Sequence, residues 1–209
     1  MYLFTRTARL APGSIRESLA WAADITDRVN RIGVVEAQLW SRTLSPGLGT
    51  LVWSTFVPDL LTLETVQAKL ESDDAYLDAV DNGAVFLTEA GADDLVATVV
   101  HGAPDPDRRP EYASVVTATI LPGRLATGMA LGVEIAEKVT GLAEAPTLFC
   151  MANSGEFARV AWLTGYASIE AMDRGEQAVY ADASFIELLD GPVSTTFEDG
   201  ESAFLRRLV

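Results

Sequence analysis

The sequence repeats itself, and this repeat constrains the fold more than any other feature. Pro12-Gly13 recurs 110 residues later as Pro122-Gly123, and after a one-residue deletion the spacing becomes 109 residues, which pairs Trp53 with Trp162. Further pairs in these two registers are Ile25 with Ile135, Val29 with Val139, Thr55 with Thr164, Asp73 with Asp182 and Tyr76 with Phe185. Self-similarity at a fixed spacing indicates a duplicated structural unit. We therefore expect two copies of one unit.

Each copy has the same predicted order of elements. Apolar and polar residues alternate over residues 2–10, which predicts a strand, and apolar residues recur at helical spacing over residues 14–31. A β-hairpin, a helix in two pieces and a last strand follow. The strands of the hairpin are expected at residues 34–43 and 48–56, the two helical pieces at 62–71 and 73–81, and the last strand at 94–101. In the second copy the elements are expected at residues 112–121, 124–140, 147–152, 159–165, 168–189 and 202–209. The order is that of the ferredoxin-like β-α-β-β-α-β unit.

This order predicts an α+β protein with two domains and a linker. The expected bounds are residues 1–102 for the first ferredoxin-like repeat and 112–209 for the second, with a linker rich in proline and charge at 103–111. Helices on one face of an antiparallel sheet leave its other face bare. We therefore expect the two sheets to pack face to face as a pseudo-dimeric α+β barrel within one chain.

The charge balance limits the partners of the protein. The 209 residues include 30 acids and 15 bases, for a formal net charge of −15. Such a charge repels nucleic-acid phosphates and anionic membrane surfaces, so we predict no nucleic-acid and no membrane partner. Arg6 and Arg9 interrupt the N-terminal apolar pattern, and no apolar run approaches the roughly 20 residues of a membrane helix. The sequence therefore predicts an acidic, cytoplasmic protein.

The motifs at the start of each copy resemble those of a known superfamily. They are LAPG at Leu10–Gly13, LPG at Leu121–Gly123 and the tryptophan strands, each followed by a helix-starting segment. The pattern resembles the dimeric α+β barrel superfamily in a tandem, single-chain form, and within it the antibiotic-biosynthesis-monooxygenase-like proteins. That superfamily includes cofactor-independent oxygenases, haem-degrading enzymes, haem peroxidase relatives, lactone isomerases and members without known activity. A fold alone does not choose between these functions.

Trp53 and Trp162 occupy equivalent places in the two copies. In the oxygenases that the chain resembles, such residues would form an aromatic wall of a ligand cavity. The alternative is that a tryptophan on a half-buried strand fills the core. Its presence in both copies favours packing.

Two polar residues complete the predicted substrate-binding set. Arg6 shares one strand face with apolar residues, so it needs a carboxylate partner or an anionic ligand if that face lines the barrel. A local salt bridge is the alternative, and we favour it. Gln38 shares a face of the second strand with Trp40 and Arg42, where it contacts either substrate or, as we expect, solvent. The predicted substrate-binding residues are thus Arg6, Gln38, Trp53 and Trp162.

Neither His101 nor Cys150 carries a strong catalytic signal. His101 is the only histidine and is able to act as an acid–base group or haem ligand, but it lies beside the predicted linker, where solvation is the simpler interpretation. The haem-degrading proteins that the chain resembles place their histidine on the second helix, which lacks one here, so haem is disfavoured even though other side chains serve as axial ligands. Cys150, the only cysteine, lies in an apolar run, and we expect a buried, inert thiol.

The motif search leaves two functional hypotheses. The sequence has no phosphate-binding glycine loop, no dinucleotide fingerprint, no nucleophile-elbow serine and no spaced metal-binding loop, so we predict neither a cofactor nor a metal. The first hypothesis is a cofactor-independent, monooxygenase-like enzyme that acts on a small apolar organic substrate in a barrel cavity. The second is a non-catalytic protein of the same fold that binds a small ligand or assembles as a homo-oligomer. The lack of a clear general base counts against the first.

Overall fold

The computed structural model describes residues 1–105 and 107–209, except for the side chains of residues 89 and 90. Pro106, which belongs to the predicted linker, lies outside the described residues. The chain divides into two compact units. Unit 1 comprises residues 1–96 together with 207–209, and unit 2 comprises residues 97–206.

The strands form the framework of both units. They are β1 (Tyr2–Leu10), β2 (Gln38–Thr43), β3 (Thr50–Val57), β4 (Leu87–His101), β5 (Tyr112–Ile120), β6 (Thr147–Ala152), β7 (Arg159–Tyr166) and β8 (Phe197–Arg207). The hydrogen-bonded order of the strands is β1-β3-β2-β8-β5-β7-β6-β4. In unit 1, β3 pairs antiparallel with β1 and β2, and in unit 2 the antiparallel pairs are β4–β6, β6–β7, β5–β7 and β5–β8. The predicted α+β class is therefore confirmed.

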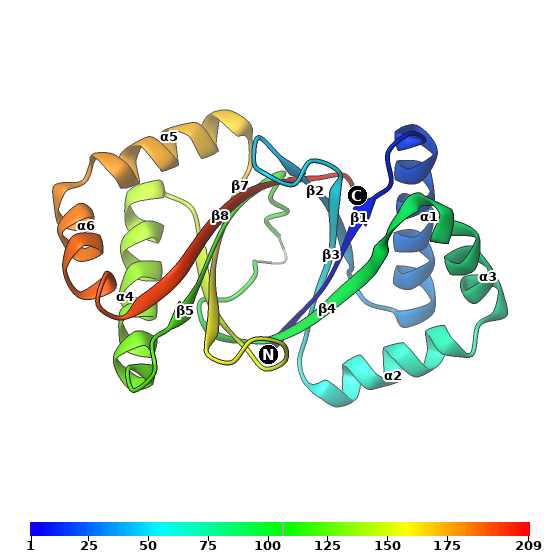
Figure 1. Cartoon of the computed structure of the whole chain (residues 1–209), viewed down its shortest axis with the longest axis horizontal. Helices are drawn as coiled ribbons and strands as arrows, with labels where there is room; N and C mark the ends of the chain where they lie inside the picture. The colour runs from blue at the N-terminus through cyan, green and yellow to red at the C-terminus, as the bar shows by residue number, and fades with distance from the viewer. Residues whose placement is uncertain (106) are drawn as a thin grey trace. The chain divides into compact units, whose positions relative to one another are not determined.

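In unit 1 the helices cover one face of β1, β3 and β2 (Figure 1). They are α1 (Ile15–Gly33), α2 (Leu60–Glu71) and α3 (Asp74–Gly83), followed by the short helix η1 (Ala84–Phe86). The residues buried between strands and helices include Ala8, Leu10, Ala22, Leu39, Leu51 and Trp53. Leu39 also pairs with the tail of this unit, since its carbonyl accepts a hydrogen bond of 2.7 Å from the Leu208 N–H.

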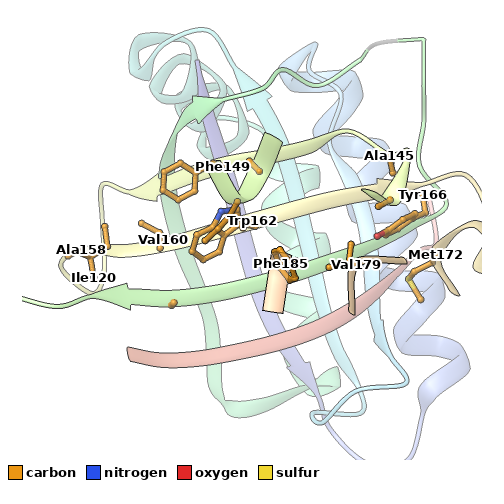
Figure 2. Close-up of a cluster of buried hydrophobic side chains, with 14 residues drawn as sticks. Ile120, Ala145, Phe149, Ala158, Val160, Trp162, Tyr166, Met172, Val179 and Phe185 are labelled. Atoms are coloured by element: carbon orange, nitrogen blue, oxygen red, sulfur yellow. The ribbon is translucent and has the colours of Figure 1, made fainter. Parts of the chain in front are cut away.

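In unit 2 the helices are α4 (Leu125–Ala143), α5 (Ile169–Ala181), α6 (Ala183–Leu188) and η2 (Leu189–Val193). They lie on one face of the unit 2 strands (Figure 1) and pack on it through a large buried apolar cluster, whose side chains are drawn in Figure 2. The Phe149 and Trp162 rings stack at 5.3 Å between centroids, and Phe197 meets Trp162 edge-on at 5.4 Å. Aromatic rings in these arrangements contribute strongly to a core.

Aspartate side chains divide the second helical region of each copy. Asp73 accepts a hydrogen bond from the Tyr76 N–H and starts α3, and Asp182 accepts one from the Phe185 N–H and starts α6. A capping carboxylate satisfies one of the free N–H groups in the first turn of a helix. The two helical pieces predicted at residues 62–71 and 73–81 are therefore confirmed as separate helices, whereas the segment predicted as one helix over residues 168–189 is divided.

The last strand of each copy is longer than the sequence pattern indicates. β4 begins at Leu87 instead of residue 94, and β8 begins at Phe197 instead of residue 202. Residues 198–201 are all exposed, so the alternation that reveals a half-buried strand is missing there. No helix in the described ranges is both long enough and apolar enough to span a membrane.

Candidate functional site

Arg6 forms a two-pronged ion pair within unit 1. Its Nε and Nη2 atoms donate to the two carboxylate oxygens of Asp94, both at 2.7 Å. The hydrogen bond with Asp94 is the main cause that raises the pKa of Arg6 above its ordinary value, against the opposing effect of burial. The predicted carboxylate partner is thus present, and it lies on β4, 88 residues along the chain.

A double-mutant cycle on Arg6→Met and Asp94→Asn tests whether this pair is structural. Because both side chains are more than a third exposed, we expect a coupling energy of no more than about 1 kcal/mol in urea unfolding. An unchanged unfolding free energy together with weakened ligand binding would instead assign Arg6 to a binding site.

Trp53 and Trp162 both point into the core beneath the first helix of their units. The Trp53 indole N–H donates to the Thr26 hydroxyl of α1 at 3.0 Å, and the Trp162 indole N–H donates to the Gly132 carbonyl of α4 at 2.8 Å. The two side chains are buried, with residue exposures of 8% and 6%. Each indole therefore has its polar group satisfied by the protein itself.

The structure brings only two of the four predicted substrate-binding residues together. Arg6 and Trp53 are cross-strand partners in β1 and β3, so their side chains share the helix-covered face of the sheet. Gln38 pairs with Ser54 and lies on the opposite face, where the Trp40 indole N–H donates to the Ser54 hydroxyl at 2.9 Å. Trp162 belongs to unit 2.

Cys150 and His101 lie on neighbouring strands of unit 2. Cys150 is fully buried, as the sequence predicted, and burial raises the pKa of its thiol to about 12. A thiol with this pKa stays protonated near neutral pH and is a poor nucleophile. His101 ends β4 opposite Phe149 and is half-buried.

A pocket of about 170 Å³ lies in unit 2 where β5 ends and α4 begins. It is lined by Thr119, Ile120, Leu121, Pro122, Gly123, Leu125, Phe157, Ala158 and Glu198. Ile120 and Ala158 lie together at one end of the buried cluster (Figure 2), joined by a hydrogen bond of 3.0 Å from the Ile120 N–H to the Ala158 carbonyl. The Pro122-Gly123 turn, in which Gly123 has a φ of 78°, forms another part of the wall.

Thr119, one of the two polar residues in the pocket lining, is 8% exposed. Its hydroxyl donates to the Glu156 carboxylate at 2.9 Å and accepts a longer bond of 3.4 Å from Arg159 Nη1. Arg159 also donates to the Thr117 hydroxyl at 2.7 Å. Glu198 is the cross-strand partner of Thr119 on β8, so an exposed carboxylate faces the buried hydroxyl.

The sequence motifs do not predict this pocket, although one of them lies beside it. The LPG segment at Leu121–Gly123, which carries the resemblance to the α+β barrel superfamily, is also part of the pocket wall. A second signal lies in the repeat, because Thr119 pairs with Arg159 where the first copy pairs Arg9 with Thr50. In unit 2 the threonine lies on the first strand of the pair and the arginine on the second, and in unit 1 the two residue types are exchanged. The two units therefore differ in the side chains at this position.

Comparison with solved structures shows the fold of the chain. A candidate monooxygenase from Fusobacterium nucleatum superposes with a TM-score of 0.71 at 10% identity, covering 100% of this chain and 92% of the other. A candidate monooxygenase from Lactobacillus acidophilus gives 0.67 at 10% identity, with 99% and 93% covered. An anthrone oxidase-like protein gives 0.64 at 9% identity, with 100% and 91% covered.

No protein-family model and no curated protein sequence matches the chain. At identities near 10% the three structures establish a shared architecture and nothing about shared chemistry. The α+β fold expected from the sequence is therefore shared with these three structures.

Proposed function

We propose that the protein is a monooxygenase-like enzyme that oxidises a small, largely apolar organic molecule in the pocket of unit 2 without a cofactor. The observation that carries this proposal is the pocket lining, in which six apolar residues and Gly123 accompany two polar residues, Thr119 and Glu198. Apolar walls with a few placed polar groups are typical of small-molecule sites. The fold shared with candidate monooxygenases and an anthrone oxidase-like protein supports the choice of oxidation.

The size of the pocket restricts the substrate. A volume of about 170 Å³ lies below the ~300 Å³ at which typical ligand pockets begin, which favours a molecule of one ring over a fused polycycle. Oxygenation of an activated methylene group needs no external reductant. The methylene loses two hydrogen atoms and becomes a carbonyl with one atom of O₂, while the second oxygen atom leaves as water. Glu198 is the proton acceptor that the lining offers for activating such a substrate.

The second candidate is a non-catalytic small-molecule-binding protein. It is favoured by the contacts of the residues first predicted to bind substrate, since Arg6 is held by Asp94 and both indole N–H groups are bonded within the core. These contacts support structural roles for the three residues. The substrate-binding proposal therefore moves from these three residues to the unit 2 pocket. Gln38 does not belong to the lining of that pocket, and its contact with substrate or with solvent stays a prediction.

Oxygen uptake by the purified protein tests the enzymatic proposal. We expect uptake of one O₂ per molecule of product with one-ring compounds that carry an activated methylene, with no added metal, flavin or nicotinamide. Anthrone, a larger probe, should react more slowly because of the pocket volume. Leu125→Trp places a bulkier side chain in the lining of the pocket and should abolish uptake.

Ile15→Trp is the matched control, because Ile15 starts α1 at the position that Leu125 holds in α4. This variant should retain full activity. If no compound causes oxygen uptake but Leu125→Trp still removes binding of the same compounds, the protein is a binding protein and the enzymatic proposal fails.

We infer further that the two units descend from one ferredoxin-like ancestor as a tandem duplication. Two features support this inference. Each copy runs strand, helix, strand, strand, helices, strand. Equivalent tryptophans, Trp53 and Trp162, both donate their indole N–H to the first helix of their own unit.

A further inference from the structure

The polar side chains that line the unit 2 pocket are arranged to accept hydrogen bonds. Thr119 has one hydroxyl proton, and that proton is donated to Glu156 at 2.9 Å. The oxygen of Thr119 is therefore left with lone pairs, of which Arg159 engages one at a long 3.4 Å. A hydroxyl whose only proton is already donated to a carboxylate can form a hydrogen bond with a ligand only as the acceptor.

Glu198, the second polar residue of the lining, also accepts hydrogen bonds. It faces Thr119 across β5 and β8, and an ionised carboxylate is an acceptor only. Glu156 accepts the hydrogen bond from the Thr119 hydroxyl and adds a second negative charge close to Thr119. A ligand carboxylate placed here would meet like charges, which disfavours its binding.

The nearby arginine does not offset these charges for a ligand. Arg159 is engaged by two carboxylates, with Nη1 3.4 Å from Glu156 and Nη2 3.7 Å from Glu201, and by the Thr117 hydroxyl. Arg124 follows Gly123 in the chain but is not part of the lining. The guanidinium of Arg159 therefore positions Thr119 instead of receiving an anionic ligand.

We propose that this pocket selects neutral or cationic molecules that carry a hydroxyl or amino hydrogen-bond donor on an apolar body, and that it discriminates against carboxylates. The inference rests on the proposed function, because it takes the same pocket as the binding site. It adds the chemical class of the ligand: a phenol- or arylamine-type molecule whose O–H or N–H reaches Thr119 and Glu198.

Three one-ring probes of nearly equal size separate the alternatives. ¹⁹F NMR titrations of the full chain with 4-fluorophenol, 4-fluoroanisole and 4-fluorobenzoate compare a donor, a donor-free ether and an anion. We expect the phenol to bind about tenfold more tightly than the ether, which corresponds to one ligand hydrogen bond. The benzoate should bind more weakly than either.

Two variants assign the preference to named atoms. Glu198→Gln replaces a carboxylate by an amide with both donor and acceptor groups, and should narrow the gap between phenol and benzoate by about tenfold. Thr119→Val removes the buried acceptor and should weaken phenol binding while leaving the ether unchanged. Glu198 is exposed, so its variant keeps the test valid even if the buried Thr119 substitution disturbs folding.

The outcomes distinguish this inference from the function on which it rests. Equal affinities for phenol and ether, or tight binding of benzoate, with all binding lost in Leu125→Trp, would overturn the donor preference and keep the pocket. Binding of no probe, or binding that Leu125→Trp does not reduce, would overturn the pocket assignment itself and with it the proposed function.

Discussion

Replacing Trp53 with alanine is expected to lower the free energy of unfolding by about 3–5 kcal/mol, the usual cost of removing a large buried aromatic side chain. The indole is enclosed by α1 and meets the Trp21 ring edge-on at 6.2 Å. Its removal leaves a cavity that rigid neighbours fill only in part. Urea unfolding followed by far-ultraviolet circular dichroism measures the change without relying on tryptophan fluorescence.

Trp53→Phe is the control for this experiment. It keeps most of the apolar contact and loses the hydrogen bond to Thr26, so a smaller loss of about 1–2 kcal/mol is expected. Thr26 keeps a partner because its hydroxyl donates to the Ala22 carbonyl at 2.8 Å. A loss well below 1 kcal/mol in Trp53→Ala, together with altered binding of small molecules, would show that the residue is a pocket wall and not core.

Adding one methyl group at Gly132 is expected to destabilise unit 2 by about 1–3 kcal/mol. A Cβ atom at this position of α4 would lie 2.0 Å from the tip of the Phe149 ring. That ring has little room to move because it stacks on Trp162, whose indole N–H bonds the Gly132 carbonyl. Gly132→Ala should therefore separate α4 from β6 and β7, seen as a lower urea midpoint.

Gly141→Ala in the same helix provides the opposite result. Nothing lies within 4 Å of a Cβ built at this exposed position. Alanine is favoured over glycine inside a helix, so we expect a gain of about 0.5–1 kcal/mol. The two variants make the same chemical change in one helix with opposite signs. If Gly132→Ala were also stabilising, the close approach of α4 to Phe149 would be disproved.

The features predicted from the sequence are those that short segments determine. Alternation and helical spacing depend on a few neighbouring residues, so β1, α1, β5 and α4 were found close to their actual bounds. Which face of a strand meets the helices is not contained in its alternation. The alternation of β1 therefore leaves open whether the face of Arg6 lines the barrel, and in the structure this face is covered by helices.

The pocket could not be predicted for a different reason. Its chemistry depends on side chains that long stretches of sequence separate, since Thr119 lies 37 residues from Glu156 and 40 from Arg159. Threonine and glutamate are common, and neither spacing is a known motif. The register of β5 against β7 and β8 brings these side chains together, because it pairs Thr119 with Arg159 on β7 and with Glu198 on β8.

The pairing of residues 207–209 with β2 has a consequence for how the chain is made. Leu208 and Val209 bond to the backbone of Leu39, so unit 1 keeps an unpaired strand edge until these residues have left the ribosome. Most residues of unit 1 are synthesised first, yet its sheet is finished after the whole of unit 2 has been translated. Contacts between such distant residues slow folding, and an open edge invites association with other chains.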